Sequence, residues 1–212
     1  MKIEIWSDVV CPWCYVGKRR LETALAGFEH RDEVEVVYRS FELDPTAPQH
    51  GHELTTGVLA RKYGRTEDEM RDMQQQLVEV AAQEGLAFRL FENVHTNTVD
   101  AHRVLQLALA EGGPDLQREL KEALLAAYFV RAEDVGDHDV LRAAARAASS
   151  PAARAYGATG VPFYVVDRKF GVSGAQPAEV FGQVLEQAWA ESRPRLQMAG
   201  EGDACGPEGC AV

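Results

Sequence analysis

The chain has 212 residues, of which 46% are apolar and 26% are charged. This balance is typical of a globular protein and excludes a largely disordered or fibrous chain. The 22 Lys and Arg residues against 33 Asp and Glu residues leave a net charge of −11. We therefore expect no nucleic-acid partner and no membrane partner, because phosphates and anionic lipids would repel the protein. No apolar stretch approaches the ~20 residues that span a bilayer.

The start of the chain favours a cytoplasmic location. After Met1 and Lys2 the alternating run at 3–7 predicts a strand, not a signal peptide. The chain also holds four cysteines. Cytoplasmic thiols are kept reduced, so these cysteines are more typical of a catalytic, redox-active or metal-binding site than of structural disulfides.

Cys11 and Cys14 form a CxxC motif between this strand and a predicted helix. Pro12 suits the first position of a helix, where its missing N–H group is no loss. Cys11 should then lie at the helix N-terminus, where free backbone N–H groups and the helix dipole favour its thiolate. Cys14 should lie one turn further and be less exposed. The pair is predicted to be a dithiol–disulfide switch, with Cys11 attacking and Cys14 resolving.

Cys205 and Cys210 form a second pair, a CxxxxC, in a tail rich in Gly, Ala, Asp, Glu and Pro. Such a tail is expected to be flexible. A tether of about a dozen residues spans roughly 20 Å, so the tail pair is a candidate redox partner for the CxxC. The alternatives are an idle tail and a zinc-binding module in which the tail thiols join Cys11 and Cys14 as ligands. We favour the redox pair and predict no metal.

A second motif lies about 150 residues downstream of the CxxC, where Gly160, Val161 and Pro162 precede a β-rich run. A turn at 167–169 and a returning strand at 170–172 predict an antiparallel hairpin. Taken alone, Pro162 would be an ordinary trans proline at a strand start, since only about 5–6% of X–Pro bonds are cis.

Between a second predicted strand at 34–41 and this proline, the chain is predicted to be helical from about 50 to 156. Thr66 and Glu69 form a capping box before one helix. Further helices are expected at about 101–109, from Pro114, and after Asp137, and a last one at about 177–189. Three of these helices, the one after the capping box and the two that follow it, are expected to bury one apolar face each. The residues on those faces are Met70, Met73, Leu77, Val80, Ala81, Val104, Leu105, Leu116, Leu120, Leu124 and Tyr128.

A strand, a CPxC, a helix and a later Gly-Val-Pro with a hairpin resemble the thioredoxin fold. With the helical block, the chain resembles the DsbA family. The resemblance implies an α/β thioredoxin fold with an all-helical insertion, divided as 1–48, 49–156, 157–193 and a tail at 194–212. It also implies that Pro162 is cis and packs against the CxxC. Val161 would bind an extended peptide through its backbone, with Trp13 and Gly160 as further substrate contacts.

Five stretches (7–14, 41–45, 97–103, 160–164 and 173–177) are similar to the FrnE branch of the DsbA family, and the CxxxxC tail matches its extended form. The resemblance implies a thiol–disulfide oxidoreductase for protein or peptide thiols and disulfides, without an organic cofactor. Glutathione or a thioredoxin-type reductant would be a further partner, and the direction of the reaction stays open. The alternative is a glutathione-dependent isomerase of the 2-hydroxychromene-2-carboxylate type, or a kappa-class glutathione transferase. Those enzymes carry serine in place of Cys11.

Two carboxylates near the CxxC are weaker candidates for moving thiol protons. Asp8 precedes Cys11 by three residues, and Glu4 lies in the first predicted strand. We favour ordinary structural roles for both, a turn former for Asp8 and a solvent-facing strand position for Glu4. His102 is assigned no role.

Overall fold

The computed structural model describes residues 1–137 and 161–192. The predicted helix after Asp137, Gly160, and the tail pair Cys205 and Cys210 lie outside the described residues. Within those residues the helices and strands agree with the sequence prediction at most positions. The division into four segments stays a prediction.

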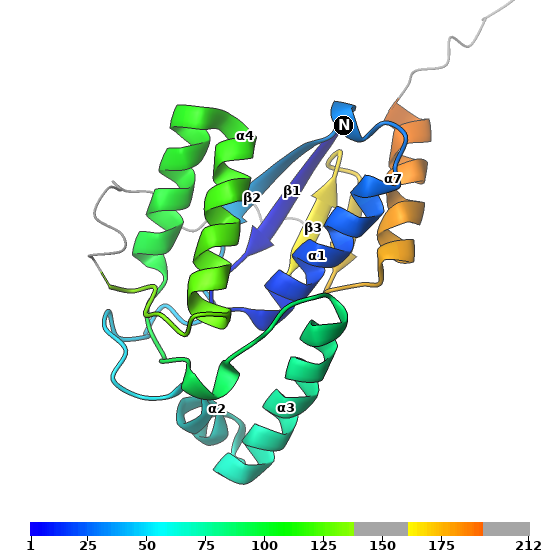
Figure 1. Ribbon diagram of the computed structural model, residues 1–212. Coiled ribbons are helices and arrows are strands. Elements are labelled where there is room, and N and C mark those ends of the chain that lie inside the picture. Colours follow the sequence, from blue (N-terminus) through cyan, green and yellow to red (C-terminus); the bar gives the residue numbers. More distant parts are fainter. Residues whose placement is uncertain (138–160, 193–212) are drawn as a thin grey trace, which may run out of the picture.

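A four-stranded sheet in the order β2-β1-β3-β4 forms the centre of the molecule (Figure 1). β1 (Lys2–Ser7) pairs in parallel with β2 (Glu35–Ser40), and antiparallel with β3 (Phe163–Val166). β3 and β4 (Phe170–Ser173) form the predicted hairpin. Asp167 and Arg168 have positive φ at its turn, which fits the twist of a tight hairpin.

One face of the sheet is covered by α1 (Pro12–Ala26) and α7 (Ala178–Ser192), which lie side by side in Figure 1. Alternation along β1 turns Ile3 and Ile5 to this face. They pack there with Leu21 of α1 and with Phe181 and Leu185 of α7. This apolar layer holds α1, and with it the CxxC, at a defined height above β1.

The opposite face carries Trp6 with Phe163 and Val165. Glu4 points to this same face, because it alternates with Ile3 and Ile5. Glu4 is buried, and its carboxylate accepts hydrogen bonds from Arg39 at 2.6 and 2.9 Å. The solvent-facing position expected for Glu4 is therefore wrong. Its position on the face away from α1 also removes it as a proton acceptor for Cys14.

The inserted helices are α2 (Thr55–Tyr63), α3 (Glu67–Gln83) and α4 (Val99–Phe129). A short 3-10 turn at Leu90–Glu92 lies between α3 and α4, and another at Arg31–Glu33 precedes β2. The capping box of Thr66 and Glu69 is present at the start of α3. α4 bends at Gly113, whose φ of 73° is left-handed, immediately before Pro114. The predicted break at this position is confirmed. Met70 is buried as expected, whereas Met73 is exposed.

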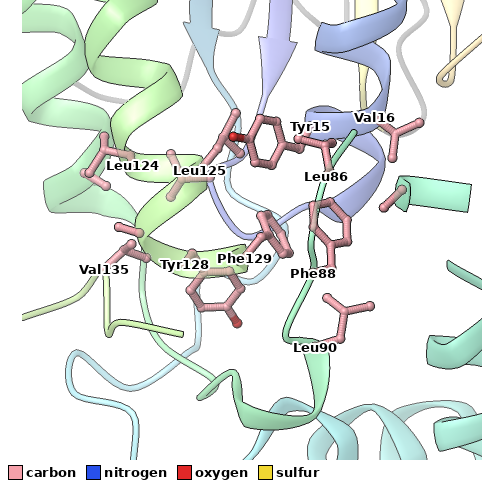
Figure 2. Close-up of a cluster of buried hydrophobic side chains, with 14 of the residues drawn as sticks. Tyr15, Val16, Leu86, Phe88, Leu90, Leu124, Leu125, Tyr128, Phe129 and Val135 are labelled. Atoms are coloured by element: carbon pink, nitrogen blue, oxygen red, sulfur yellow. The ribbon is translucent and has the colours of Figure 1, made fainter. Parts of the chain in front are cut away.

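A second apolar core joins α1 to the insertion. Figure 2 shows the rings of Tyr15, Phe88 and Phe129 gathered between α1, the segment at 86–90 and α4. Phe88 stacks on Phe129 with ring centroids 4.8 Å apart, and on Tyr15 at 5.8 Å. Because α1 contributes to both cores, the CxxC at its start lies where the sheet and the insertion meet.

α4 also covers the open edge of the sheet at β2. The side chain of Gln117 accepts a hydrogen bond from the Tyr38 N–H group and donates one to the Tyr38 carbonyl, both at 2.9 Å. An amide can pair with a strand edge in this way because it holds a donor and an acceptor together. The buried face of α4 therefore contains Gln117 and Lys121, and Leu116, predicted to be buried, is exposed.

Candidate active site

Cys11 occupies the position predicted for it, the N-cap of α1, and Pro12 is the first residue of the helix. The Cys11 side chain makes no capping hydrogen bond with the first turn of α1. The free N–H groups of the first turn and the positive end of the helix dipole therefore lie at the Cys11 sulfur. Both favour a negative charge on that sulfur, the form in which a thiol attacks a disulfide.

Cys14 lies one turn into α1, and its N–H group donates to the Cys11 carbonyl at 3.0 Å. Both cysteines are free thiols, and each is only 4% exposed. The expectation that Cys14 would be the less exposed of the two is therefore wrong. Burial raises the pKa of the Cys14 thiol well above its usual range, and the hydrogen bond with Cys11 raises it further.

Val161, two residues before β3, contacts the Cys11 sulfur. The Cys11 thiol donates to the Val161 carbonyl at 3.7 Å, across 150 residues of sequence. The Val161–Pro162 peptide bond is cis, as the resemblance implied. Gly17 lets α1 approach this segment closely, since a Cβ there would lie 3.3 Å from the Pro162 ring and against the Tyr164 hydroxyl. The structure therefore places Cys11, Val161 and Pro162 together. Trp13, two residues after Cys11 in α1, is 42% exposed.

Asp8 is fully buried in the loop before the CxxC, so it is more than a turn former. Its carboxylate accepts hydrogen bonds from the N–H groups of Val9 and Leu43, both at 2.7 Å. His102 of α4 lies 3.1 Å away through Nε2. Burial alone would raise the pKa of Asp8, but the hydrogen bond and charge interaction with His102 together with the Leu43 N–H lower it below its usual value. The contact between Asp8 and His102 therefore attaches the loop before Cys11 to α4.

Lys121 of α4 is the group at this site that sequence reasoning missed. Its side chain is 1% exposed and its ammonium lies 5.6 Å from the centre of the Tyr38 ring. Its charge interacts with Cys14, Asp8 and Cys11. The sequence offered little signal, since Lys121 is one of several charged residues in the predicted helix from Pro114. His102 was missed as well, because its partner Asp8 is 94 residues away.

In the ranges 1–137 and 161–192, no three His, Cys, Asp or Glu side chains are grouped so that they could hold a metal ion. The four-thiolate zinc alternative involves Cys205 and Cys210 and is therefore untested. The helices of the same ranges are too short or too polar to span a membrane.

A family model described as a DSBA-like thioredoxin domain matches residues 2–150. The chain belongs to this family. The match confirms the predicted α/β thioredoxin-like fold with a helical insertion. The position of the Cys11–Cys14 pair near the N-terminus is consistent with the CxxC site of a DsbA-like oxidoreductase.

Two relatives are close enough to compare along most of the chain. A solved structure described as a probable DsbA oxidoreductase from Streptomyces coelicolor is 42% identical, with a TM-score of 0.80, and covers 100% of this chain and 99% of that one. The uncharacterised protein YwbO of Bacillus subtilis is 28% identical over 145 residues. That match covers 66% of this chain and 62% of YwbO, slightly less than two thirds of its length.

A more distant likeness shows the fold alone. The cytosolic disulfide reductase DsbM from Pseudomonas aeruginosa is 16% identical, with a TM-score of 0.59, and covers 90% of this chain and 100% of that one. A second structure of that reductase is described as being with GSH.

Proposed function

We propose that this protein is a thiol–disulfide oxidoreductase that acts on protein or peptide disulfides through Cys11 and Cys14. The observation that carries the proposal is the position of Cys11, a free thiol at the N-terminus of α1 with a second free thiol one turn away. A thiolate stabilised at a helix N-terminus beside a resolving thiol is what disulfide exchange requires. Family membership and the Streptomyces coelicolor relative support the same chemistry.

The exchange has two steps. The Cys11 thiolate attacks one sulfur of the substrate disulfide, a Cys11–substrate disulfide forms, and the other substrate sulfur leaves as a thiolate. Cys14 then loses its proton and attacks the Cys11 sulfur, which releases the second substrate sulfur. The substrate gains two electrons and two protons, and the enzyme is left with a Cys11–Cys14 disulfide. The same steps run in reverse when the enzyme oxidises a dithiol.

We infer that an extended peptide lies along the segment that precedes β3. Val161 offers backbone groups beside the Cys11 sulfur, and Trp13, two residues after Cys11, presents an exposed apolar ring. A cavity of about 80 Å³ reaches the loop before the CxxC and is lined by Asp8, Val10 and side chains of α2 and α4. Substrate contacts by Trp13, Gly160, Val161 and Pro162 are part of this proposal.

Membership of the FrnE branch also stays a proposal, supported by the stretches that resemble it. Glutathione or a thioredoxin-type reductant is a candidate electron donor, and the GSH complex of the distant reductase DsbM supports the former. A cytoplasmic location remains a prediction from the sequence. The isomerase and transferase alternative is disfavoured by Cys11, because those enzymes use a serine at this position to bind the glutathione thiolate.

The tail pair is proposed as a relay that exchanges with Cys11 and Cys14. Only its spacing and the reach of the tail support this. Replacing both Cys205 and Cys210 by serine should slow steady-state turnover while leaving the first attack by Cys11 unchanged. Unchanged rates in both measurements would remove the relay.

The function itself is tested by turnover on a protein disulfide such as insulin, with dithiothreitol as the reductant. We expect the intact chain to reduce it and Cys11→Ser to abolish turnover. Trp13→Ala is the matched control on the same helix turn, and it should weaken substrate binding without removing the chemistry. Turnover that survives Cys11→Ser would show that the assignment is wrong.

A further inference from the structure

Lys121 is a buried cation whose ammonium has no hydrogen-bond partner among the described residues. A lysine taken out of water normally pairs with a carboxylate or keeps its ammonium at the surface. The nearby Lys18 follows that rule, since its ammonium donates to Glu22 at 2.6 Å and to Glu122 at 2.5 Å. Lys121 does not, although it lies only one residue from Glu122.

The neighbours of Lys121 on α4 fix its position. Gln117, one turn earlier, is hydrogen-bonded to both backbone groups of Tyr38 at the edge of β2. Glu122, the next residue, binds Lys18 and Arg19 of α1. The side chain of Lys121 is thus held between β2 and α1, over the face of the Tyr38 ring. This is the sheet face on which α1 and its CxxC pack.

Among the described residues, the groups that interact most strongly with Lys121 come from α1, the loop before it and β2. They are Cys11 and Cys14 at the start of α1, Asp8 in the preceding loop, Lys18 further along α1, and Tyr38 on β2. The carboxylate of Asp8 already has hydrogen-bond partners in Val9, Leu43 and His102. The sulfurs of Cys14 and Cys11 are the neighbours whose charge changes during disulfide exchange, and of the two only Cys11 lies at the helix N-terminus. Tyr164 and Tyr38 also lie close enough to Cys14 for their charges to interact with it.

We propose that Lys121 is a positioning residue for the resolving step, and that its buried ammonium stabilises the thiolate of Cys14 as that thiolate attacks the disulfide on Cys11. The inference rests on the proposed function. It adds that a charged side chain of the inserted helix α4 assists the resolving step. In this step the Cys14–Cys11 bond forms, the Cys11–substrate bond breaks, and the proton lost by Cys14 ends on the released substrate sulfur. A cation in a dry site acts strongly over several ångströms, because little water screens it.

The reaction needs this charge because burial opposes the thiolate. Burial raises the pKa of Cys14, and the interaction with Lys121 lowers it. Burial likewise lowers the pKa of Lys121, while the sulfurs of Cys14 and Cys11 and the carboxylate of Asp8 raise it. Each group therefore favours the charged form of the other. Cys11 already has the helix N-terminus, so loss of Lys121 should affect Cys14 more than Cys11.

The experiment measures the thiolate of Cys14 without any turnover. In a Cys11→Ser, Cys205→Ser, Cys210→Ser chain, Cys14 is the one remaining cysteine, and its alkylation rate by iodoacetamide at fixed pH reports its thiolate fraction. Adding Lys121→Met should slow alkylation about tenfold, the change expected for a pKa rise of about one unit. Lys121→Arg should restore most of the rate. Lys18→Met, which removes a buried lysine already paired with carboxylates, should not slow alkylation.

A loosened fold would expose Cys14 and speed its alkylation, so a structural effect has the opposite sign. An unchanged rate in Lys121→Met, or an equal slowing in Lys18→Met, would overturn the proposal. In the chain with all four cysteines, Lys121→Met should slow resolution of a Cys11–glutathione disulfide about tenfold and its formation less than twofold. Equal slowing of both steps would also overturn it. Because alkylation needs no substrate, an inactive enzyme that still shows the Lys121 effect would refute the proposed function alone.

Discussion

The Cys11 sulfur lies 3.7 Å from the carbonyl oxygen of Val161, the residue before the cis bond to Pro162. Two segments 150 residues apart in the chain therefore meet at the N-terminus of α1. Cys11 is as buried as Cys14. The contact supports the proposal that a substrate peptide lies alongside Val161, whose backbone could bind an extended chain.

The first prediction concerns the close approach of α1 to this segment. Gly17→Ala places a methyl group against the Tyr164 hydroxyl and the Pro162 ring. We expect the free energy of unfolding to fall by about 1–3 kcal/mol, because the buried neighbours must shift. Gly182→Ala in α7 is the control, since nothing lies within 4 Å of its Cβ. It should gain about 0.5–1 kcal/mol from helix propensity. Urea denaturation measures both free energies of unfolding. Equal changes in the two variants would contradict the close packing at Gly17.

The second prediction concerns Asp8 and His102, which join the CxxC loop to α4. Asp8→Asn should lower the free energy of unfolding by about 1–3 kcal/mol at neutral pH, since a charged acceptor of three hydrogen bonds is lost. Its pKa is lowered in the folded protein, so this stability is present above about pH 4 and is lost as the pH falls through the folded-state pKa. A double-mutant cycle with His102→Gln should give a coupling energy of about 0.5–3 kcal/mol. Additive effects would show that the two side chains do not interact.

The third prediction concerns the ionic contact between α1 and α4. Burial would raise the pKa of Glu122, but hydrogen bonds from Arg19, Lys18 and Tyr15 lower it to about 2. Glu122 therefore contributes stability that is complete above about pH 4.5 and is lost as the pH falls towards 2. Glu122→Gln should cost about 1–3 kcal/mol at pH 7 and almost nothing at pH 2, a range that allows for partial exposure of the pair. A cost that stays constant with pH would contradict this.

The fourth prediction is that Lys121 is retained at a cost in stability. Lys121→Met removes a buried ammonium that has no hydrogen-bond partner within 1–137 and 161–192, and leaves an apolar chain of similar length. The free energy of unfolding should rise by about 1–2 kcal/mol, measured by urea denaturation. Lys18→Met should instead lower the free energy of unfolding, because it removes the buried lysine that pairs with the carboxylates of Glu22 and Glu122. A Lys121→Met variant less stable than the parent chain would show that the lysine serves the fold.

Much of the fold could be predicted because its signals are local. The strand at 2–7, Pro12 at the helix start, the capping box at Thr66 and the turn at 167–169 depend on residues that are neighbours in sequence. The position of Cys11 followed from the same signals. The cis bond at Pro162 came from the resemblance and not from the residues themselves.

The errors arose where distant segments determine burial. Apolar spacing put Leu116 on the buried face of α4, but the edge of β2 selects Gln117, whose amide can bond Tyr38. Lys121 lies one helical turn after Gln117, so the burial of Gln117 places Lys121 on the buried face as well. Glu4 was expected in solvent because its partner Arg39 lies on another strand. No local pattern encodes which strand or helix will lie opposite a given side chain.

The central claim is that Cys11 attacks a disulfide and Cys14 resolves the product. The most direct measurement is the intact mass of a Cys14→Ser, Cys205→Ser, Cys210→Ser chain after exposure to a disulfide-linked peptide. We predict a mixed disulfide on Cys11 that persists, and none on a matched Cys11→Ser, Cys205→Ser, Cys210→Ser chain under the same conditions. A chain with Cys14 restored should release the peptide and end two hydrogens lighter. An adduct on Cys14 in place of Cys11, or no adduct on either chain, would contradict the account.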